Sequence, residues 1–242
     1  MSYLCPMFLF FTNEITGEEA HFGEEEARHC LQVLRKNAGD SLFFTDGAGG
    51  WYEGVVATVG KRHFTAKITA RQEGFGKRDF RLHIAIAPPK NMDRLEWFLE
   101  KATELGIDEI TPLLTARSER PKIRVERLEK IMLSAMKQSL RAYLPRLNEM
   151  TGFAQFLRQG ATGPGVARFI AHCRQEDLPH LKDNCPKGGS VTILIGPEGD
   201  FTMEEIALAE QSGYQPVGLG KARLRTETAG LAACHIVNLI ND

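Results

Sequence analysis

Apolar and polar positions follow one pattern in the first third of the chain. Up to about residue 74, short β-branched and aromatic runs alternate with turn residues, and these runs are PMFLFFT, DSLFFTDG, WYEGVVATVG and HFTAKITAR. Each run predicts a strand. The stretch EEEARHCLQVLR repeats its apolar residues at three- and four-residue spacing, which predicts a helix. Several short strands around one helix are typical of a small β-barrel.

A different pattern begins after a glycine-rich linker at residues 74–78. The predicted strands are LHIAIAP, EITPLL, ARFIAHC, VTILIG and QPVGLG, and the predicted helices are NMDRLEWFLEKATEL, residues 123–143, a segment after residue 202 and residues 229–240. Continuous apolar strands that alternate with helices predict a parallel α/β sheet covered on both faces. Ligands of such sheets bind beyond the carboxyl ends of the strands. We therefore expect two domains, 1–74 and 75–242.

Length and composition agree with this picture. The 242 residues suit one large domain or two small ones, and 43% hydrophobic with 25% charged residues is ordinary for a soluble globular protein. No apolar run is long enough to cross a bilayer. The apolar start, MSYLCPMFLFF, lacks basic residues and a small-residue cleavage site, so it predicts a first strand and not a signal peptide.

The cysteines and histidines argue against a disulfide framework and against a metal site. The chain has five cysteines, which is an odd number, and none of them are in C-x-x-C spacing. Its seven histidines are scattered singly, without an H-E-x-x-H motif. We therefore expect no bound metal and a reducing, cytoplasmic setting.

Positive charge is concentrated in one segment. Residues 111–146 contain nine Lys or Arg and three Glu, although the net charge of the chain is −1. On the predicted long helix, four cations share a sector of about 80°, namely Arg127, Lys130, Lys137 and Arg141. Such a stripe suits the phosphates of a nucleic acid, and it also suits a solvated helix face.

The stretch VTILIGPEGDF carries the first candidate chemistry. A buried strand runs into Gly196 and Gly199, which allow a sharp turn and the close approach of a ligand. Thr202 and Glu205 have the spacing of a capping box, so a helix should begin there. The loop is neither a Walker A loop nor G-x-G-x-x-G, and its acidic residues would repel phosphate. It suits a ligand with little negative charge that is contacted by backbone groups, or a purely structural turn.

A second glycine loop follows in VGLGKARLRTETAG. Another strand ends at Leu219 and Gly220, and the segment that contains Arg225 and Glu227 then leads into a helix. These two residues should lie near the ends of the same strands as Gly196. They could serve chemistry, or they could form a salt bridge that holds the turn. The helix that follows is apolar nearly all round, so it should be buried in the domain or against another subunit.

Together these motifs resemble one family. LIGPEGDF followed by LGKARLRTETA is similar to the RsmE-type small-subunit rRNA uridine N3-methyltransferases of the SPOUT superfamily. KATELGI, SER at residues 118–120, MKQSLRAYLPR and HCLQVLRKNAGD also match its patterns. The chain departs from the family at Asp200, where Gly is common, and at Leu128, where Trp is frequent. The segment after ARFIAH lacks the acidic residue that we expect there.

The resemblance implies a fold and its ligands. It implies an α/β protein in which a small PUA-like β-barrel domain is followed by a SPOUT domain with a carboxyl-terminal trefoil knot. The cofactor would be S-adenosyl-L-methionine and the substrate 16S rRNA within the small ribosomal subunit. The protein would form a homodimer, and the face of the last helix that carries Ala229, Ala233, Ile236 and Ile240 is the expected contact.

The resemblance also implies functional residues. The expected cofactor-binding residues are His172, Leu194, Ile195, Gly196, Pro197, Glu198, Gly199, Leu219, Gly220, Leu224, Arg225 and Thr226. With the basic segment, the expected RNA-binding residues are Arg28, Arg35, Arg117, Arg120, Arg124, Arg127, Lys130, Lys137 and Arg141.

Methylation of uridine N3 requires removal of its proton and stabilisation of the resulting anion. Arg225 is the candidate for stabilisation, and either Glu198 or Glu227 is the candidate base. The alternatives are a SPOUT enzyme that acts on another base or on ribose O2′, and a non-catalytic RNA-binding assembly factor. A nucleotide-dependent oxidoreductase is disfavoured, because its fingerprint is absent.

Overall fold

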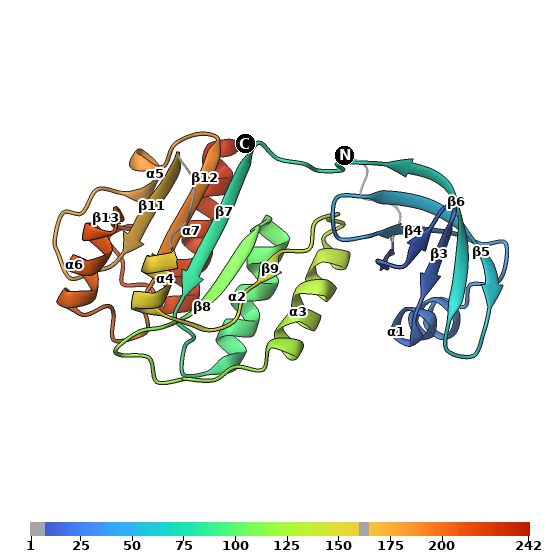
Figure 1. Cartoon of the computed structure of the whole chain (residues 1–242), viewed down its shortest axis with the longest axis horizontal. Coiled ribbons are helices and arrows are strands. Elements are labelled where there is room, and N and C mark those ends of the chain that lie inside the picture. Colours follow the sequence, from blue (N-terminus) through green and yellow to red (C-terminus); the bar gives the residue numbers. More distant parts are fainter. Residues whose placement is uncertain (1–7, 160–164) are drawn as a thin grey trace. The chain divides into compact units, whose positions relative to one another are not determined.

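The computed structural model describes residues 8–159 and 165–242, and the chain divides into two compact units (Figure 1). The first consists of residues 1–77 and 136–144, and the second of residues 78–135 and 145–242. Residues 136–144, which the sequence pattern placed in the second domain, therefore pack with the first unit. Cys5 and the start of the predicted first strand lie outside the described residues.

The first unit is built on a sheet of six strands in the order β1-β4-β5-β6-β3-β2. They are β1 (Leu9–Phe11), β2 (Ile15–Thr16), β3 (Glu19–Phe22), β4 (Ser41–Thr45), β5 (Trp51–Val59) and β6 (Phe64–Gln72). Only β1 and β4 pair in parallel among these neighbours. The hydroxyl of Thr12, just after β1, donates to the carbonyl of His21 in β3, so the sheet curls on itself. The strands β2 and β3 escaped prediction because their segment, EITGEEAHF, is mostly polar.

Aromatic side chains fill the inside of this curled sheet. The most buried of them are Phe10, Phe22, Phe44 and Phe64, each at most 2% exposed. The rings of Phe22 and Phe64 stack with their centroids 4.3 Å apart. The predicted helix packs on the same core through Ala27 and Cys30. Only its first turn, α1 (Glu24–Ala27), is α-helical, and the next six residues form a π-helix, η1 (Arg28–Val33).

Residues 136–144 are tied to the first unit by the turn after β4. The backbone N–H of Gly49 and the hydroxyl of Thr45 both donate to the carbonyl of Ala142, at 2.8 and 3.2 Å. The backbone N–H of Leu144 donates to the carbonyl of Gly47 at 2.9 Å. These bonds hold the segment in an irregular path, so it does not continue the preceding helix.

The prediction of a helix over residues 123–143 is therefore wrong at its end. The helix α3 covers Val125–Gln138. Leu140 has a φ of 56°, in the left-handed region where helices commonly end. Arg141 lies beyond the helix, so it is not part of the basic stripe that the sequence predicted.

The second unit has a sheet of seven strands in the order β10-β8-β7-β12-β11-β13, and β9 pairs with β8. The strands are β7 (Phe80–Ile86), β8 (Glu109–Leu114), β9 (Arg146–Leu147), β10 (Thr151–Gly152), β11 (Val166–Ala171), β12 (Gly189–Ile195) and β13 (Gln215–Val217). The helices besides α3 are α2 (Met92–Leu105), α4 (Phe153–Gln159), α5 (Leu181–Asn184), α6 (Met203–Gln211) and α7 (Thr226–Asn241). All of the strand pairs are parallel, which confirms the predicted parallel sheet.

Helices cover both faces of this sheet (Figure 1). On one face, Phe153 and Phe156 of α4 and Ile206 of α6 form a cluster with Leu194 and Ile170 of the strands. On the other face, α7 packs against α2 and β7. A side chain at Gly230 would come within 2.8 Å of the ring of Phe98, so glycine is required for this close approach.

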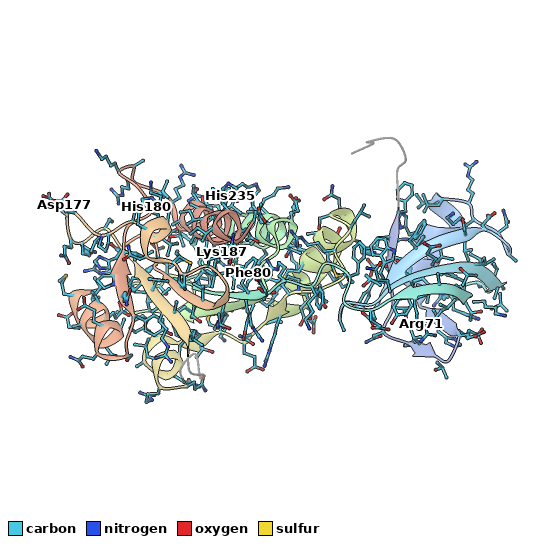
Figure 2. All side chains as sticks on the ribbon, turned by 90° about the horizontal axis from the view of Figure 1, so that it is seen from above. Arg71, Phe80, Asp177, His180, Lys187 and His235 are labelled. Atoms are coloured by element: carbon cyan, nitrogen blue, oxygen red, sulfur yellow. The ribbon has the colours of Figure 1, made fainter. Side chains whose placement is uncertain are left out.

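One side of α7 is buried and the other is exposed. Ala233, Cys234 and Val237 are 0% exposed. Leu239 is 63% exposed, and His235 lies on the outer side of the helix (Figure 2). The expected contact face for a second subunit included Ala233, and this part of the prediction is wrong. Ala233 belongs to the core of its own unit, because α7 packs directly on α2.

Candidate functional site

A cavity of about 530 Å³ lies at the carboxyl ends of β11, β12 and β13. Three loops line it, at residues 171–174, 195–200 and 218–226, together with Ala229 of α7. All of the expected cofactor-binding residues except Leu194 are in its wall. Leu194 is 0% exposed and belongs to the hydrophobic cluster under α4 and α6. A parallel sheet is expected to bind its ligand at this edge.

The loop after β12 is a tight turn closed by its own residues. The backbone N–H of Asp200 donates to the carbonyl of Pro197 at 2.9 Å. A side chain at Gly196 would come within 3.2 Å of the ring of Phe201, so the turn leaves little space there. Asp200 has a φ of 59°, which explains why glycine suits this position. The predicted capping box of Thr202 and Glu205 is confirmed, and α6 begins directly after it.

The loop after β13 is held by backbone hydrogen bonds to the first residue of α5 and to the segment before it. The N–H of Leu181 donates to the carbonyl of Gly218, and the N–H of Gly218 donates to the carbonyl of Pro179, both at 3.0 Å. Gly220 has a φ of 122°, a conformation that favours glycine. The second glycine loop thus presents backbone groups at the cavity from a fixed position.

The start of α7 connects the two glycine loops. Thr226 is 5% exposed, and its hydroxyl donates to the carbonyl of Gly196 at 3.1 Å. Thr226 is the first residue of the helix and does not cap it, because the N-cap residue is Arg225, which makes no side-chain capping bond. The hydroxyl of Thr226 is used for a contact 30 positions away along the chain.

Arg225 and Glu227 do not form the salt bridge that was one reading of the sequence. Glu227 is 7% exposed and lies 3.8 Å from Arg94, measured from Oε1 to Nε. It is not in the wall of the cavity. Arg225 is exposed and lines the cavity. No carboxylate in the described part of the chain forms an ion pair with Arg225.

The structure separates the two candidate bases. Glu198 lines the cavity, and its Oε1 accepts a hydrogen bond from the backbone N–H of Lys90 at 3.0 Å. Glu227 is held under α7 beside Arg94. Glu198 is therefore the candidate base that shares the cavity with Arg225.

His172 is a half-buried polar group in the same wall. Burial lowers the pKa of His172, and the charge of Asp200 acts in the opposite direction. The ring is therefore neutral near pH 7. Its Nδ1 accepts a hydrogen bond from the backbone N–H of Arg174 at 3.3 Å. Its Nε2 is buried without a partner within residues 8–159 and 165–242, so it is suitably placed to bond with a ligand.

Several residues of the cavity wall were not predicted from the sequence. They are Ala171, Cys173, Arg174, Asp200, Gly218, Ala222, Arg223 and Ala229. Asp200 joins two loops, because its Oδ2 accepts hydrogen bonds from the backbone N–H of Cys173 at 3.0 Å and from the Cys173 thiol at 3.2 Å. In the sequence, Asp200 stood out only because it departs from the family pattern. That departure did not show which residues Asp200 would contact.

The predicted RNA-binding residues have different environments. Arg28 and Arg35 are exposed in the first unit. Arg124 is exposed just before α3, and Arg127 and Lys130 are exposed along α3. The last three line a second hollow of about 790 Å³ that runs from Ile123 to Ser134. This hollow lacks glycine loops, so it is less suited to a small cofactor than the cavity beside β12.

Two cations of the predicted stripe are already paired. Lys137 forms an ion pair with Glu26, and the side chains are 19% and 10% exposed. The guanidinium of Arg127 bonds to Glu96 at 2.7 Å. The expectation of one continuous stripe from Arg127 to Arg141 is therefore wrong, because Lys137 is neutralised by Glu26 and Arg141 lies beyond the helix.

Comparison with known proteins identifies the family. The family model described as "RNA methyltransferase domain" matches residues 77–238, and the one described as "RNA methyltransferase PUA domain" matches residues 22–69. The ribosomal RNA small subunit methyltransferase E of Bacillus subtilis is 32% identical over 238 residues, which are 94% of this chain and 90% of the relative. The chain belongs to the ribosomal RNA small subunit methyltransferase E family.

Solved structures agree with membership in the methyltransferase E family. A structure from Porphyromonas gingivalis is 36% identical, with a TM-score of 0.89 and coverage of 97% of this chain and 98% of that chain. The ribosomal RNA small subunit methyltransferase E of Neisseria gonorrhoeae was solved bound to S-adenosyl methionine. It is 26% identical with a TM-score of 0.82, and the match covers 97% of this chain and 98% of that chain.

Two further properties concern the described part of the chain. It has no helix that is both long enough and apolar enough to cross a membrane. Within residues 8–159 and 165–242, no group of three or more His, Cys, Asp or Glu side chains is arranged to hold a metal ion.

Proposed function

We propose that this protein transfers a methyl group from S-adenosyl-L-methionine to N3 of a uridine in 16S rRNA of the small ribosomal subunit. The observation that carries the proposal is the cavity beside β12. It combines two glycine loops, the buried Nε2 of His172, which has no partner in residues 8–159 and 165–242, and the exposed guanidinium of Arg225. Family membership supplies the reaction class. We propose a cytoplasmic location, because ribosomal subunits are assembled there.

The cavity fits the chemistry of S-adenosylmethionine. The backbone of the loops at residues 195–200 and 218–220 offers hydrogen-bond donors and acceptors to the adenine and the methionyl part, and His172 offers one ring nitrogen. The acidic residues Glu198 and Asp200 are compatible with a ligand that carries a positive sulfonium and no phosphate. When bound, the cofactor supplies an electrophilic methyl group.

Two side chains of the cavity are assigned to the reaction. Glu198 accepts the proton from uridine N3, which leaves an anion delocalised over N3, O2 and O4. Arg225 donates hydrogen bonds to an oxygen of this anion and stabilises it. Methyl transfer would then form the N3–carbon bond and break the bond between the methyl group and the sulfur, so that S-adenosylhomocysteine would be the leaving group. The base must enter the cavity from the RNA, so the target nucleotide is splayed out of its stack.

The finer structural proposals concern the knot, the domains and the dimer. We infer that the carboxyl-terminal segment forms a trefoil knot, since the loops after β12 and β13 meet at one cavity and Thr226 is bonded to Gly196. The domain at residues 1–74 would help to hold RNA, and the domain at residues 75–242 would carry catalysis. For the homodimer we propose the outer side of α7, where Leu239 is 63% exposed. His235, four residues earlier on the same helix, lies on this outer side (Figure 2).

Mass spectrometry of rRNA nucleosides from a deletion strain tests the proposed function. Loss of 3-methyluridine from the small subunit, restored by the wild-type gene, is the expected result. Loss of a ribose methyl mark or of another methylated base would assign the chain to a different reaction. No loss of any mark would point to a non-catalytic assembly factor.

A further inference from the structure

Two arginines converge on one carbonyl at the mouth of the cavity. Arg117, from the segment after β8, donates from Nη1 to the carbonyl of Gly199 at 2.8 Å. Arg174, from the loop after β11, donates from Nη2 to the same oxygen at 2.6 Å. The two distances add to 5.4 Å, which is the greatest separation that these two nitrogens can have. Like charges at this distance repel each other, so the arrangement favours an anion beside them.

Two carboxylates lie beside these arginines. Asp200 lies 3.7 Å from Arg174, measured from Oδ2 to Nε, and it already accepts bonds from Cys173 and from the backbone N–H of Phe201. Glu204 is exposed, and its pKa is lowered first by its own hydrogen bonds. The positive charge of Arg117 also lowers this pKa, so Glu204 lies near Arg117. Arg223 adds a further positive charge beside them.

An electrostatic effect on the thiol of Cys173 indicates that Arg223 lies near it. Burial raises the pKa of the Cys173 thiol, and the charge of Arg223 acts in the opposite direction. Arg223 and Arg174 both line the cavity, and Arg223 is exposed. The mouth of the cavity therefore has positive charge on the loop after β11 and on the loop after β13.

The two converging guanidiniums have hydrogen-bonding capacity left. A guanidinium carries five N–H donors in a planar fork that matches the oxygens of a phosphate. Within the described ranges, Arg117 uses one nitrogen for a hydrogen bond, and Arg174 uses one for the carbonyl and directs Nε toward Asp200. The aliphatic stem of Arg117 also packs closely on Gly199, because a side chain at Gly199 would come within 3.2 Å of its Cδ.

We propose that Arg117 and Arg174 form a seat for a single backbone phosphate of the substrate RNA, next to the target nucleotide. This inference rests on the proposed function, because a base that enters the cavity must leave its own phosphates at the mouth. Two guanidiniums share one phosphate, and the phosphate relieves their mutual repulsion. The sequence pattern pointed to Arg117 as a general RNA contact, but gave Arg174 no role.

The opposing view is that both arginines only brace the carbonyl of Gly199 and so hold the cofactor loop. The two roles predict different measurements. A phosphate contact contributes to the salt dependence of RNA binding, and loss of one phosphate contact lowers the slope of log K against log salt by about 0.7 to 1. A brace contributes to cofactor affinity and leaves that slope unchanged.

The experiment compares Arg117→Gln, Arg174→Gln, the double variant and Arg174→Lys with the wild-type protein. Arg158→Gln is the matched control, since Arg158 is exposed on α4 of the same unit and outside the cavity wall. Binding of a labelled oligouridylate and of unmethylated small subunits is measured from about 50 to about 200 mM salt. Calorimetry measures S-adenosylmethionine affinity for each variant.

Three results are expected if the seat is correct. The double variant lowers the slope by about 0.7 to 1, and each single glutamine variant lowers it by less, because the remaining guanidinium still neutralises the same phosphate. Arg174→Lys keeps most of the slope, since an ammonium still neutralises a phosphate. Arg158→Gln keeps the wild-type slope, and cofactor affinity changes less than threefold, roughly, in every variant.

Other results overturn the inference. Unchanged slopes with weakened cofactor binding would make both arginines a brace. A loss of about 0.7 to 1 in each single variant and of twice that in the double variant would mean two separate phosphates. Failure of the proposed function is distinguishable. If the wild-type protein methylates no subunit but the slope differences remain with oligouridylate, the seat stands and the reaction is wrong. If subunits are methylated normally and the slopes are equal, the reaction stands and the seat is wrong.

Discussion

Replacement of Thr226 by valine removes one hydrogen bond between α7 and the loop after β12 and keeps the shape of the side chain. Thr226 is 5% exposed, and its hydroxyl donates to the carbonyl of Gly196 at 3.1 Å. Valine fills a similar volume, so no cavity opens. The carbonyl of Gly196, however, loses this donor in a buried position. The variant therefore tests whether this bond couples the helix to the cofactor loop.

The size of the effect follows from burial. A typical hydrogen bond contributes about 1 kcal/mol, and a buried carbonyl left without a donor costs about 1 to 3 kcal/mol. We expect the free energy of unfolding of the second unit to fall by about 1 to 3 kcal/mol. Each kcal/mol shifts the melting temperature by about 2 to 4 °C at this chain length, so a fall of about 2 to 12 °C is expected.

Differential scanning calorimetry measures the melting temperature, and titration calorimetry measures S-adenosylmethionine affinity. Cofactor affinity should weaken by up to about tenfold, because part of the binding free energy must then order the loop. Thr226→Ser keeps the hydroxyl and should retain most of the stability. Thr228→Val changes an exposed threonine in the first turn of the same helix and should have little effect. If Thr226→Val and Thr228→Val melt at the same temperature, the bond does not couple the helix to the loop.

Three further predictions use other parts of the second unit. Arg225→Ala should lower turnover in single-turnover methylation by roughly 10² or more with little change in cofactor affinity, and Arg225→Lys should recover only part of the rate; undiminished turnover would remove Arg225 from the mechanism. Burial lowers the pKa of His83 from 6.5 to about 4. Between these pH values, His83 binds a proton in the unfolded chain but not in the folded one. The free energy of unfolding should therefore fall as pH drops from 6.5 to 4, by at most about 3 kcal/mol for this residue. Urea titrations of His83→Gln should show a smaller loss over that window, and parallel curves would contradict the assignment. Leu239→Glu should convert the proposed dimer to a monomer in light scattering, whereas Leu208→Glu on α6, a site 39% exposed, should not; a dimer that persists in Leu239→Glu would exclude this face.

Much of the fold could be predicted from the sequence because it depends on short-range patterns. The apolar runs that became β7, β8 and β12 are continuous, and a continuous apolar run needs cover on both faces. The capping box at Thr202 and Glu205 was predicted correctly because its two partners are three residues apart. The π-helical turn of η1 and the strands β2 and β3 were missed, since no local signal distinguishes them from a regular helix or a polar loop.

The candidate site was located by the glycine loops, but its internal contacts were decided by the tertiary structure. Two alternatives had remained for Glu227, as a base or as a partner of Arg225, and it lies beside Arg94 instead. The helix α3 ends early, because Leu140 has a left-handed backbone conformation and residues 136–144 pack with the first unit. Arg141 is therefore not part of the predicted stripe.

The sequence by itself determined where strands end, where glycine is needed and which residues carry charge, because these depend on neighbours within a few positions. Only the tertiary structure decided which distant groups share a hydrogen bond. Thr226 bonds to Gly196, Asp200 bonds to Cys173, and Arg117 and Arg174 meet at Gly199. Such pairs are selected by packing of whole strands and helices, since a side chain has many possible partners along the chain and only one within 3 Å or so once the loops are folded.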